Sequence, residues 1–263
     1  MSNRVRLTTD SRGVATVTLS RPHTHNAFDN CMVDELTRAF ETIMTNPLAR
    51  VMILAAEGKT FSAGADLTWM KRMGEYSYEE NLNDAKNLAE MLKVLNEIPL
   101  PTIARVQGPA FGGALGLISC CDIAIASTNA SFAFSEVKIG LIPATISPYI
   151  IKAMGSRASR RYFITGEKFG AQQAVTLGLI DEAVEYSQLN NHITQLITAL
   201  LKNSPAAMQA SKQLVQDIER RPIDDTLIKK TYERIADIRL SKEGQEGLSA
   251  FLEKRKPHWR QDN

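Results

Sequence analysis

The feature that most constrains the fold is a run of consecutive apolar residues at 50–55, Arg-Val-Met-Ile-Leu-Ala. A strand with one face in water alternates apolar and polar residues, whereas a strand buried on both faces reads as a continuous apolar run. Such strands belong to parallel sheets that are covered by helices on both sides. We therefore expect this segment to be an inner strand of an α/β fold.

The rest of the chain supports this expectation, because strand and helix patterns alternate in its first half. We predict strands over 13–19, 102–107 and 122–127, helices over 30–44 and 81–95, and a short helix that opens at Gly112 and Gly113. From about residue 204 the pattern is helical only, with helices expected over 206–218, 226–238 and 246–254. We therefore expect a core domain over 1–203 and an attached helical region over 204–263.

Charge and composition exclude several classes of protein. The 263 residues contain 31 Lys or Arg and 29 Asp or Glu, a net charge of +2, which argues against general nucleic-acid binding. The surplus lies within 251–263, a basic tail with four cations and two anions. No apolar stretch is long enough for a membrane helix, and we expect a cytoplasmic protein with no membrane partner. The odd number of cysteines favours a reducing compartment, and the histidine spacing predicts no metal site.

The first motif that could carry chemistry is Phe-Ser-Ala-Gly-Ala-Asp-Leu at 61–67. Small residues around a glycine let the backbone approach a ligand closely. If Asp66 caps the next helix, the amide of Ala65 lies just outside the positive end of that helix. An ordinary loop-to-helix turn is the alternative.

The second motif is Gln-Gly-Pro-Ala-Phe-Gly-Gly-Ala-Leu-Gly at 107–116, where a buried strand runs into a glycine pair that opens a helix. Free amides at a helix N-terminus bind an anion or a developing oxyanion. Close packing of helix on strand also needs small residues and is the alternative. The motif is neither a dinucleotide fingerprint nor a phosphate loop.

The third motif places Glu136 among aromatic and aliphatic residues at 132–143. Burial raises the pKa of a carboxyl group and suits it to proton transfer near neutral pH. The alternative is a partly exposed glutamate that pairs with Lys138 or another cation.

Together the three motifs are more specific than any one of them. Two amide donors could converge on one thioester oxygen, and the carboxyl group could act at the adjacent carbons. The sequence resembles the enoyl-CoA hydratase/isomerase (crotonase) superfamily, from Leu-Ser-Arg-Pro at 19–22 to Glu-Gly-Leu-Ser-Ala-Phe-Leu-Glu-Lys-Arg at 246–255. The resemblance implies an α/β crotonase-like (ClpP/crotonase) spiral of ββα units with a C-terminal helical region. It also implies a coenzyme A thioester as substrate and no permanently bound cofactor.

The resemblance further assigns roles to individual residues. It implies that the backbone amides of Ala65 and Gly113 form an oxyanion hole and that Glu136 moves the proton. It places CoA, the phosphate-bearing substrate, against a loop and a C-terminal pair: Ala63, Ala65, Asp66, Leu67, Thr68, Gly113, Phe251 and Lys254. In related proteins the position of Lys254 sometimes comes from a neighbouring subunit, whereas a solvated helix end is the alternative.

One position departs from the pattern. Hydratases that use two glutamates carry the first where this chain has Gly116. A single glutamate is typical of the family's Δ3,Δ2-enoyl-CoA isomerases. Yet the amino-acid sequences of the three motifs resemble those of bacterial methylglutaconyl-CoA and carboxygeranoyl-CoA hydratases. Those enzymes act in leucine and acyclic-terpene breakdown, on substrates with a second carboxylate. We expect that glycine here removes a negative charge and opens space that an anionic acyl group could occupy.

We therefore predict a hydratase for a branched, carboxylated enoyl-CoA. The alternatives are a single-glutamate isomerase and a non-catalytic member that binds acyl-CoA or RNA. The resemblance implies a homotrimer, or a hexamer of two trimers, built through the C-terminal helices. An apolar set after the first motif either lines the acyl pocket or belongs to the core: Trp69, Met70, Met73 and Tyr76.

Overall fold

The computed structural model describes residues 4–260 and contains two sheets. The larger sheet has the strand order β1-β2-β3-β4-β6-β9, with β1 antiparallel to β2 and the other neighbours parallel. Its strands are β1 (Val5–Thr9), β2 (Val14–Leu19), β3 (Val51–Ala56), β4 (Thr102–Val106), β6 (Ile123–Ser127) and β9 (Glu182–Val184). The smaller sheet has the order β5-β7-β8, made of β5 (Ala110–Phe111), β7 (Ser131–Ala133) and β8 (Phe169–Gly170).

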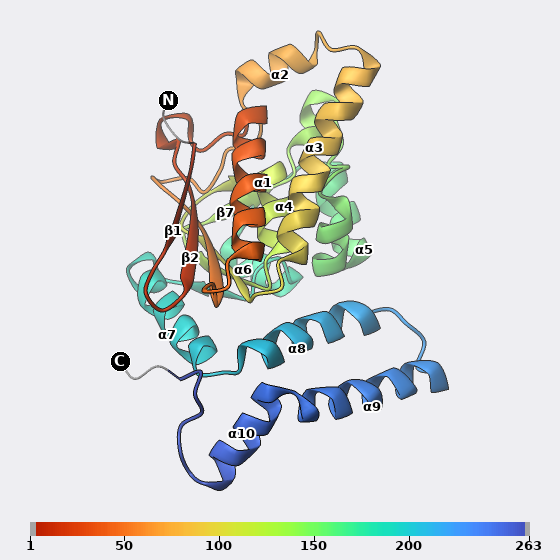
Figure 1. Cartoon of the computed structure of the whole chain (residues 1–263). Coiled ribbons are helices and arrows are strands. Elements are labelled where there is room, and N and C mark those ends of the chain that lie inside the picture. The colour runs from red at the N-terminus through yellow and green to blue at the C-terminus, as the bar shows by residue number, and fades with distance from the viewer. Residues whose placement is uncertain (1–3, 261–263) are drawn as a thin grey trace.

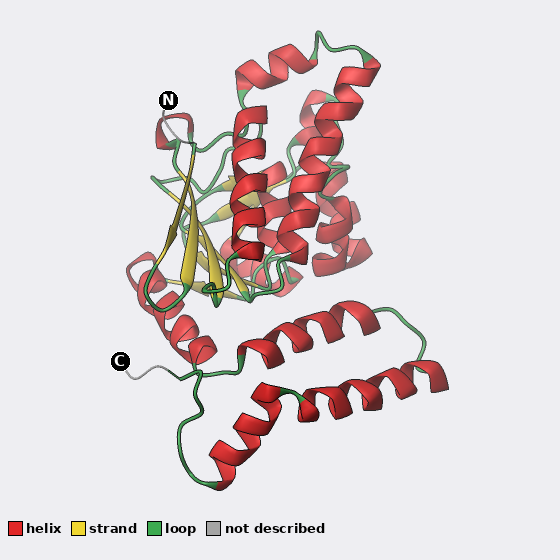
Figure 2. Ribbon diagram, in the orientation of Figure 1, coloured by secondary structure: helices red, strands yellow, loops and turns green. Residues whose placement is uncertain are grey.

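Helices cover the larger sheet and form an arm beyond it (Figures 1 and 2). Those of the sheet region are α1 (Asn30–Thr45), α2 (Leu67–Met73), α3 (Tyr78–Glu97), α4 (Gly113–Cys120), α5 (Ser147–Thr165), α6 (Ala171–Leu177) and α7 (Leu189–Leu201). Three single turns of 3-10 helix span Pro22–Thr24, Glu136–Ile139 and Tyr186–Gln188. The arm consists of α8 (Pro205–Ile218), α9 (Asp225–Leu240) and α10 (Lys242–Leu252).

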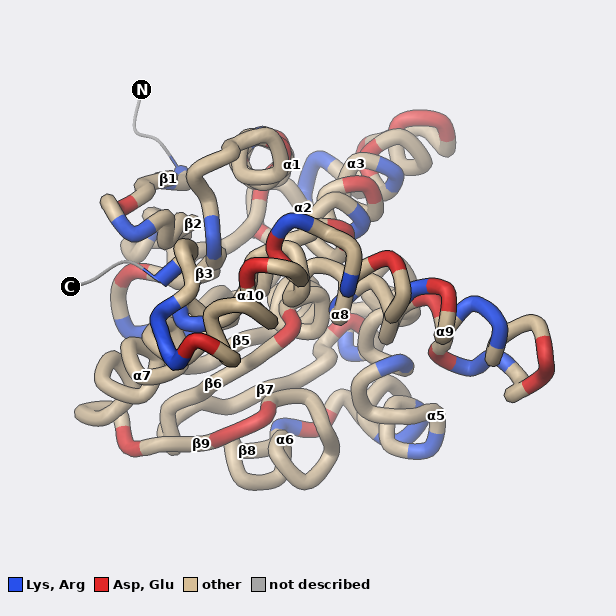
Figure 3. Tube along the Cα trace, turned by 60° about the horizontal axis from the view of Figure 1, so that its bottom comes forward, with Lys and Arg blue, Asp and Glu red and all other residues tan. Residues whose placement is uncertain are grey.

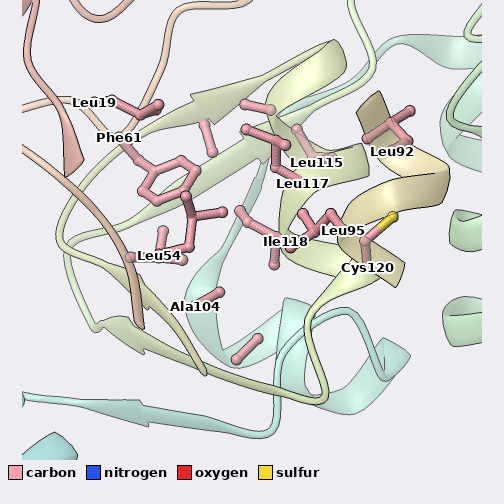
Figure 4. Close-up of a cluster of buried hydrophobic side chains, with 14 of the residues drawn as sticks. Leu19, Leu54, Phe61, Leu92, Leu95, Ala104, Leu115, Leu117, Ile118 and Cys120 are labelled. Atoms are coloured by element: carbon pink, nitrogen blue, oxygen red, sulfur yellow. The ribbon is translucent and has the colours of Figure 1, made fainter. Parts of the chain in front are cut away.

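Strand β3 is buried on both faces, as the apolar run predicts. Met52 and Leu54 face the core that includes α1, α3 and α4, and Figure 4 shows Leu54 on the same side as Phe61. Val51 and Ile53 face a second cluster that includes residues of α7. Two helical layers therefore cover this strand, which confirms the predicted α/β fold.

The sequence patterns missed the outer strands. β1 is an edge strand, and buried and exposed residues alternate only weakly along it. It pairs with β2 in antiparallel register. β9 has three residues and lies beside β6, from which it is distant in sequence. Short strands of this kind are defined by the pairing with a remote strand, so a local pattern carries little of their signal.

Helix α8 is bonded to the sheet region, because Lys212 pairs with Asp122 at 2.8 Å and the Gln216 side chain donates to the Asn96 carbonyl. Helices α9 and α10 lie farther from the sheets in Figure 1, and α8 and α9 contain no buried residue. Helix α10 begins at Lys242, earlier than predicted, because the Ser241 side chain accepts a hydrogen bond from the Gly244 amide and caps the helix. It ends at Leu252, so Lys254 lies beyond it, with a positive φ of 54°. Across residues 4–260, no helix combines the length and apolarity that crossing a membrane requires.

Candidate active site

The loop that carries Ala65 is held beside Phe28 in the manner of a parallel strand pair. The Phe28 amide donates to the Gly64 carbonyl at 2.7 Å, and the Asp66 amide donates to the Phe28 carbonyl, also at 2.7 Å. The Ala63 amide donates to the His25 carbonyl at 2.9 Å. These bonds fix the loop from one side and direct the Ala65 amide to the other.

Asn26 supports this loop from beneath. Its side chain is fully buried and donates to the carbonyls of Glu57 and Thr60 at 2.8 and 2.9 Å, while its oxygen accepts from the Arg21 amide. The Arg21 guanidinium lies 3.4 Å from the carboxylate of Asp66. Sequence reasoning assigned no role to this support, although Arg21 stands in the segment at 19–22 with which the family resemblance begins.

Asp66 caps α2, as predicted. Its carboxylate accepts from the amides of Thr68 and Trp69 at 2.9 and 3.3 Å. On either side of Ala65, the Gly64 amide donates to Ser62 Oγ at 3.2 Å and the Asp66 amide donates to the Phe28 carbonyl. No acceptor within residues 4–260 takes the Ala65 N–H. A polar backbone group without a partner is uncommon and indicates a place for a ligand or water.

The second motif lies against the first. The Phe111 amide donates to the Ser62 carbonyl at 3.0 Å, and a Cβ added to Gly64 would lie 3.1 Å from the Phe111 carbonyl oxygen. Gly112 has a φ of +55° and donates to the Ala133 carbonyl. Gly113 is the first residue of α4, and no acceptor in the described part of the chain takes its N–H. Two amides with no acceptor thus lie on loops that touch each other.

Glu136 lies over this junction. A Cβ added to Gly112 would be 3.2 Å from Glu136 Oε1, and Oε2 is buried without a hydrogen-bond partner in the part of the chain that is described. Burial raises the pKa of the Glu136 carboxyl group. The Lys138 side chain extends toward Gly166 instead, so the alternative in which the two side chains pair is wrong. The site therefore joins two free N–H donors to a carboxyl group suited to proton transfer.

The expectation of open space at Gly116 is wrong. A Cβ there would lie 2.4 Å from Cγ2 of Ile146 and 3.3 Å from Cδ2 of Leu92. Ile146 is 2% exposed, so its side chain fills the room that a longer residue at position 116 would use. An acyl group cannot occupy that volume.

The residues assigned to CoA fall into two groups. Ala63, Leu67 and Thr68 are exposed on the loop and first turn of α2, beside Ala65. Phe251 and Lys254 are exposed at the end of the arm, and Figure 1 shows α2 and α10 at opposite ends of the molecule. One chain thus does not bring these two groups together. Trp69 is buried in the main hydrophobic core.

The basic tail is partly neutralised within the chain. The Arg255 guanidinium pairs with Glu246 and Glu253 at 2.6 and 2.7 Å and lowers the pKa of Glu246 to about 2. Figure 3 shows basic and acidic residues interspersed along α9. Within residues 4–260 no group of acidic, histidine and cysteine side chains has the arrangement of a metal site.

Fold and site together define an α/β enzyme with paired backbone donors, and comparison with known proteins names its family. The sequence profile described as enoyl-CoA hydratase/isomerase matches residues 9–262, so this chain belongs to that family. The structure of an enoyl-CoA hydratase from Shewanella pealeana superposes with a TM-score of 0.94 at 49% identity, covering 98% of this chain and 96% of that chain. The predicted crotonase fold is thereby confirmed.

Two curated relatives show the range of activities in the family. An enoyl-CoA isomerase/hydratase of Mycosarcoma maydis is 34% identical over 262 residues, which cover 93% of this chain and 92% of that protein. The 2,3-dehydroadipyl-CoA hydratase of Escherichia coli K12 is 29% identical over 249 residues, covering 94% of this chain and 95% of that protein. Enzymes of this family act on CoA thioesters.

Proposed function

We propose that this enzyme adds water to the α,β double bond of an enoyl-CoA whose thioester oxygen is held by the amides of Ala65 and Gly113. The observation that carries the proposal is the pair of acceptor-free N–H groups on touching loops, with Glu136 over their junction. As water adds to the β-carbon, negative charge develops on the thioester oxygen. Each donor aimed at that charge is worth about 3 kcal/mol of transition-state stabilisation.

Glu136 is proposed as the acid that protonates the α-carbon of the resulting enolate. Its raised pKa keeps more of it protonated near neutral pH than an ordinary glutamate. The same group, once ionised, can remove an α-proton in the reverse direction. The chain's own groups thus supply both the charge stabilisation and the proton.

The proposed substrate is a branched enoyl-CoA with a second carboxylate, such as methylglutaconyl-CoA of leucine breakdown in the cytoplasm. Position 116 adds no negative charge to the site. Arg72 on α2 donates to Asn30 Oδ1, and no carboxylate within residues 4–260 lies within ion-pair distance of it. The E. coli relative is named for 2,3-dehydroadipyl-CoA, whose acyl group also carries a second carboxylate. Arg72, on the helix that follows the Ala65 loop, is the cation that we propose to receive that group.

A Δ3,Δ2-enoyl-CoA isomerase is the second candidate. It is favoured by the contact of a single carboxyl group, Glu136, with Gly112 in the part of the chain that the structure describes. One such group can remove a proton and return it two carbons away. The M. maydis relative carries both activities in its name. A non-catalytic binder of acyl-CoA or RNA would have no need of a buried carboxyl group in this position.

A panel of enoyl-CoAs separates the candidates. The purified enzyme is incubated with straight, branched and carboxylated 2-enoyl-CoAs and with 3-enoyl-CoAs, and the products are analysed by mass and by double-bond position. We expect a gain of one water on 2-enoyl substrates, fastest with a carboxylated one. Double-bond migration without hydration would establish the isomerase, and binding without turnover would overturn both.

The arm, residues 204–263, is proposed to form the subunit contacts of a trimer or a hexamer of two trimers. Exposed apolar side chains follow one stripe of α9: Ile228, Tyr232 and Ile235. In such an assembly Phe251 and Lys254 would reach the CoA held by the Ala63–Thr68 loop of a neighbouring subunit. This arrangement would unite the two groups of CoA residues that lie apart in one chain.

A further inference from the structure

Addition of water requires a group that takes a proton from the attacking water. Position 116 cannot provide this group, because it is a glycine with no room for a longer side chain. Among the carboxyl groups of residues 4–260 whose pKa departs clearly from the ordinary value, burial raises that of two, Glu136 and Asp84. The others are lowered by cations or by hydrogen bonds. Asp84 thus shares with Glu136 a pKa that burial raises, although Asp84 also accepts a hydrogen bond from Trp69 and lies on a different helix.

Asp84 is held by a buried tryptophan that belongs to the first motif's helix. Trp69 Nε1 donates to Asp84 Oδ1 at 3.1 Å, and Trp69 is 3% exposed. Trp69 lies one helical turn beyond Ala65, in the first turn of α2. No cation in the described chain lies within ion-pair distance of Asp84. Arg72, also on α2, is the charged group that acts on it from an adjoining element.

The helix that carries Asp84 runs alongside the second motif. Asp84, Leu88 and Leu92 are four residues apart and share one face of α3. Leu92 contacts the space at position 116. Figure 4 shows Leu92 at the level of Leu115, and Leu95 at the level of Ile118 and Cys120, so α3 and α4 run in the same direction.

This packing places Asp84 beyond the amide end of α4. From Leu92 back to Asp84 is about 12 Å along α3, and from Gly116 back to Gly113 is about 4.5 Å along α4. Asp84 is thus roughly 7 Å farther along the shared direction than the Gly113 amide. This value is an offset along the helices and not the distance between the two groups. It puts Asp84 toward the end of α4 at which the Gly113 amide would hold an acyl chain.

We propose that Asp84, oriented by Trp69, is the second carboxyl group of the reaction and takes the proton of the attacking water. This inference rests on the proposed hydratase function. The water oxygen forms a bond to the β-carbon while one of its protons passes to the Asp84 carboxylate. The π electrons move onto the thioester oxygen, and protonated Glu136 then gives its proton to the α-carbon. Exchange of protons with solvent restores both groups.

The test separates water activation from α-proton transfer. Asp84→Asn, Glu136→Gln and the wild type are compared in hydration of the best enoyl-CoA and in α-hydrogen exchange of butyryl-CoA in D2O. Exchange uses the two amides and Glu136 but no attacking water. We expect Asp84→Asn to lose about 10²- to 10⁴-fold in hydration kcat and to keep exchange within about twofold, whereas Glu136→Gln loses both. Asp34→Asn, an exposed carboxylate on α1, is the matched control and should change neither.

Two results overturn the inference alone: hydration by Asp84→Asn within about threefold of the wild type, or equal losses of hydration and exchange, which would indicate a structural role. A wild type that exchanges or isomerises but hydrates no substrate overturns the hydratase proposal and the inference with it. Asp84→Glu should recover part of the hydration that Asp84→Asn loses.

Trp69→Phe tests the positioning. The indole hydrogen bond lowers the pKa of Asp84 against the effect of burial, so its removal should raise that pKa further. A general base acts when it is deprotonated. The fall of the hydration rate at acidic pH should therefore move to higher pH in Trp69→Phe. The fall of the α-hydrogen exchange rate at acidic pH, which Glu136 sets, should stay at the same pH. An unchanged pH dependence of hydration would contradict the role of Trp69 and Asp84.

Discussion

Ile146 occupies the space that a side chain at position 116 would need, with its Cγ2 only 2.4 Å from where a Cβ of Gly116 would be. The glycine is therefore matched to a buried isoleucine and does not mark a cavity. A glutamate at position 116 would have to displace Ile146, which is why the reaction needs its second proton-transfer group from elsewhere.

The pair predicts a non-additive double-mutant cycle. Gly116→Ala should destabilise the protein by about 1–3 kcal/mol through overpacking. Ile146→Ala should cost about 2–5 kcal/mol through the void that it leaves. Because the new methyl group enters that void, the double variant should lose less than the sum, measured by urea unfolding at fixed protein concentration. Simple additivity would show that the two positions are not in contact.

Substitution of Gly112 should lower activity by displacing Glu136, an effect beyond that of backbone strain. Gly112→Ala places a Cβ at a φ of +55° and 3.2 Å from Glu136 Oε1. Gly155→Ala is the control, since Gly155 has a φ of +74° and open space around it. Both should lose about 1–3 kcal/mol of stability. Only Gly112→Ala should lower kcat/KM, by about 10²-fold, because it displaces the carboxyl group. Equal kcat/KM values for Gly112→Ala and Gly155→Ala would show that the position of Glu136 does not matter for the reaction.

The sequence patterns predicted the inner strands and most helices of the fold, because these elements carry local signals in the sequence. The apolar run at 50–55 and the Asp66 cap are examples. What they missed depends on contacts between remote residues. The filling of position 116 by Ile146 and the pairing of Trp69 with Asp84 leave no periodic trace. The roles of Ala65, Gly113 and Glu136 came from a family resemblance and stay proposals.

Asn26 predicts a defect in substrate binding. Asn26→Gly removes three hydrogen bonds beneath the Ala65 loop but tolerates the φ of 53° at this position. Each lost bond with a buried partner costs about 1 kcal/mol or more. We expect lower stability and a raised KM, measured by thermal unfolding and initial rates. A variant that keeps the wild-type KM would show that the loop holds its shape without this support.

The Glu136 environment predicts a pH dependence for both activity and stability. Proton removal needs the ionised form, so α-hydrogen exchange should fall with decreasing pH at a midpoint above the ordinary glutamate value of about 4.3. Because the pKa is raised on folding, the stabilising effect is present at low pH and is lost as pH rises through the folded-state pKa. Glu136→Gln should therefore be more stable than the wild type at high pH and similar at low pH. The opposite order would contradict burial as the cause.

The arm predicts an assembly that matters for CoA binding. Tyr232 on α9 and Tyr186 outside the arm are both 56% exposed. Tyr232→Glu should dissociate the oligomer in analytical ultracentrifugation and weaken acyl-CoA binding, because Lys254 of a neighbour is removed. Tyr186→Glu should leave both unchanged. A monomeric wild type, or full CoA affinity in a dissociated Tyr232→Glu protein, would contradict the proposed contact.

The central claim is that Glu136 performs proton transfer beside a thioester held by two backbone amides. The most direct measurement is the turnover of Glu136→Gln on the best enoyl-CoA, together with its acyl-CoA affinity by calorimetry. The account predicts a loss of about 10²- to 10⁴-fold in kcat with affinity unchanged. Turnover near that of the wild type would contradict it.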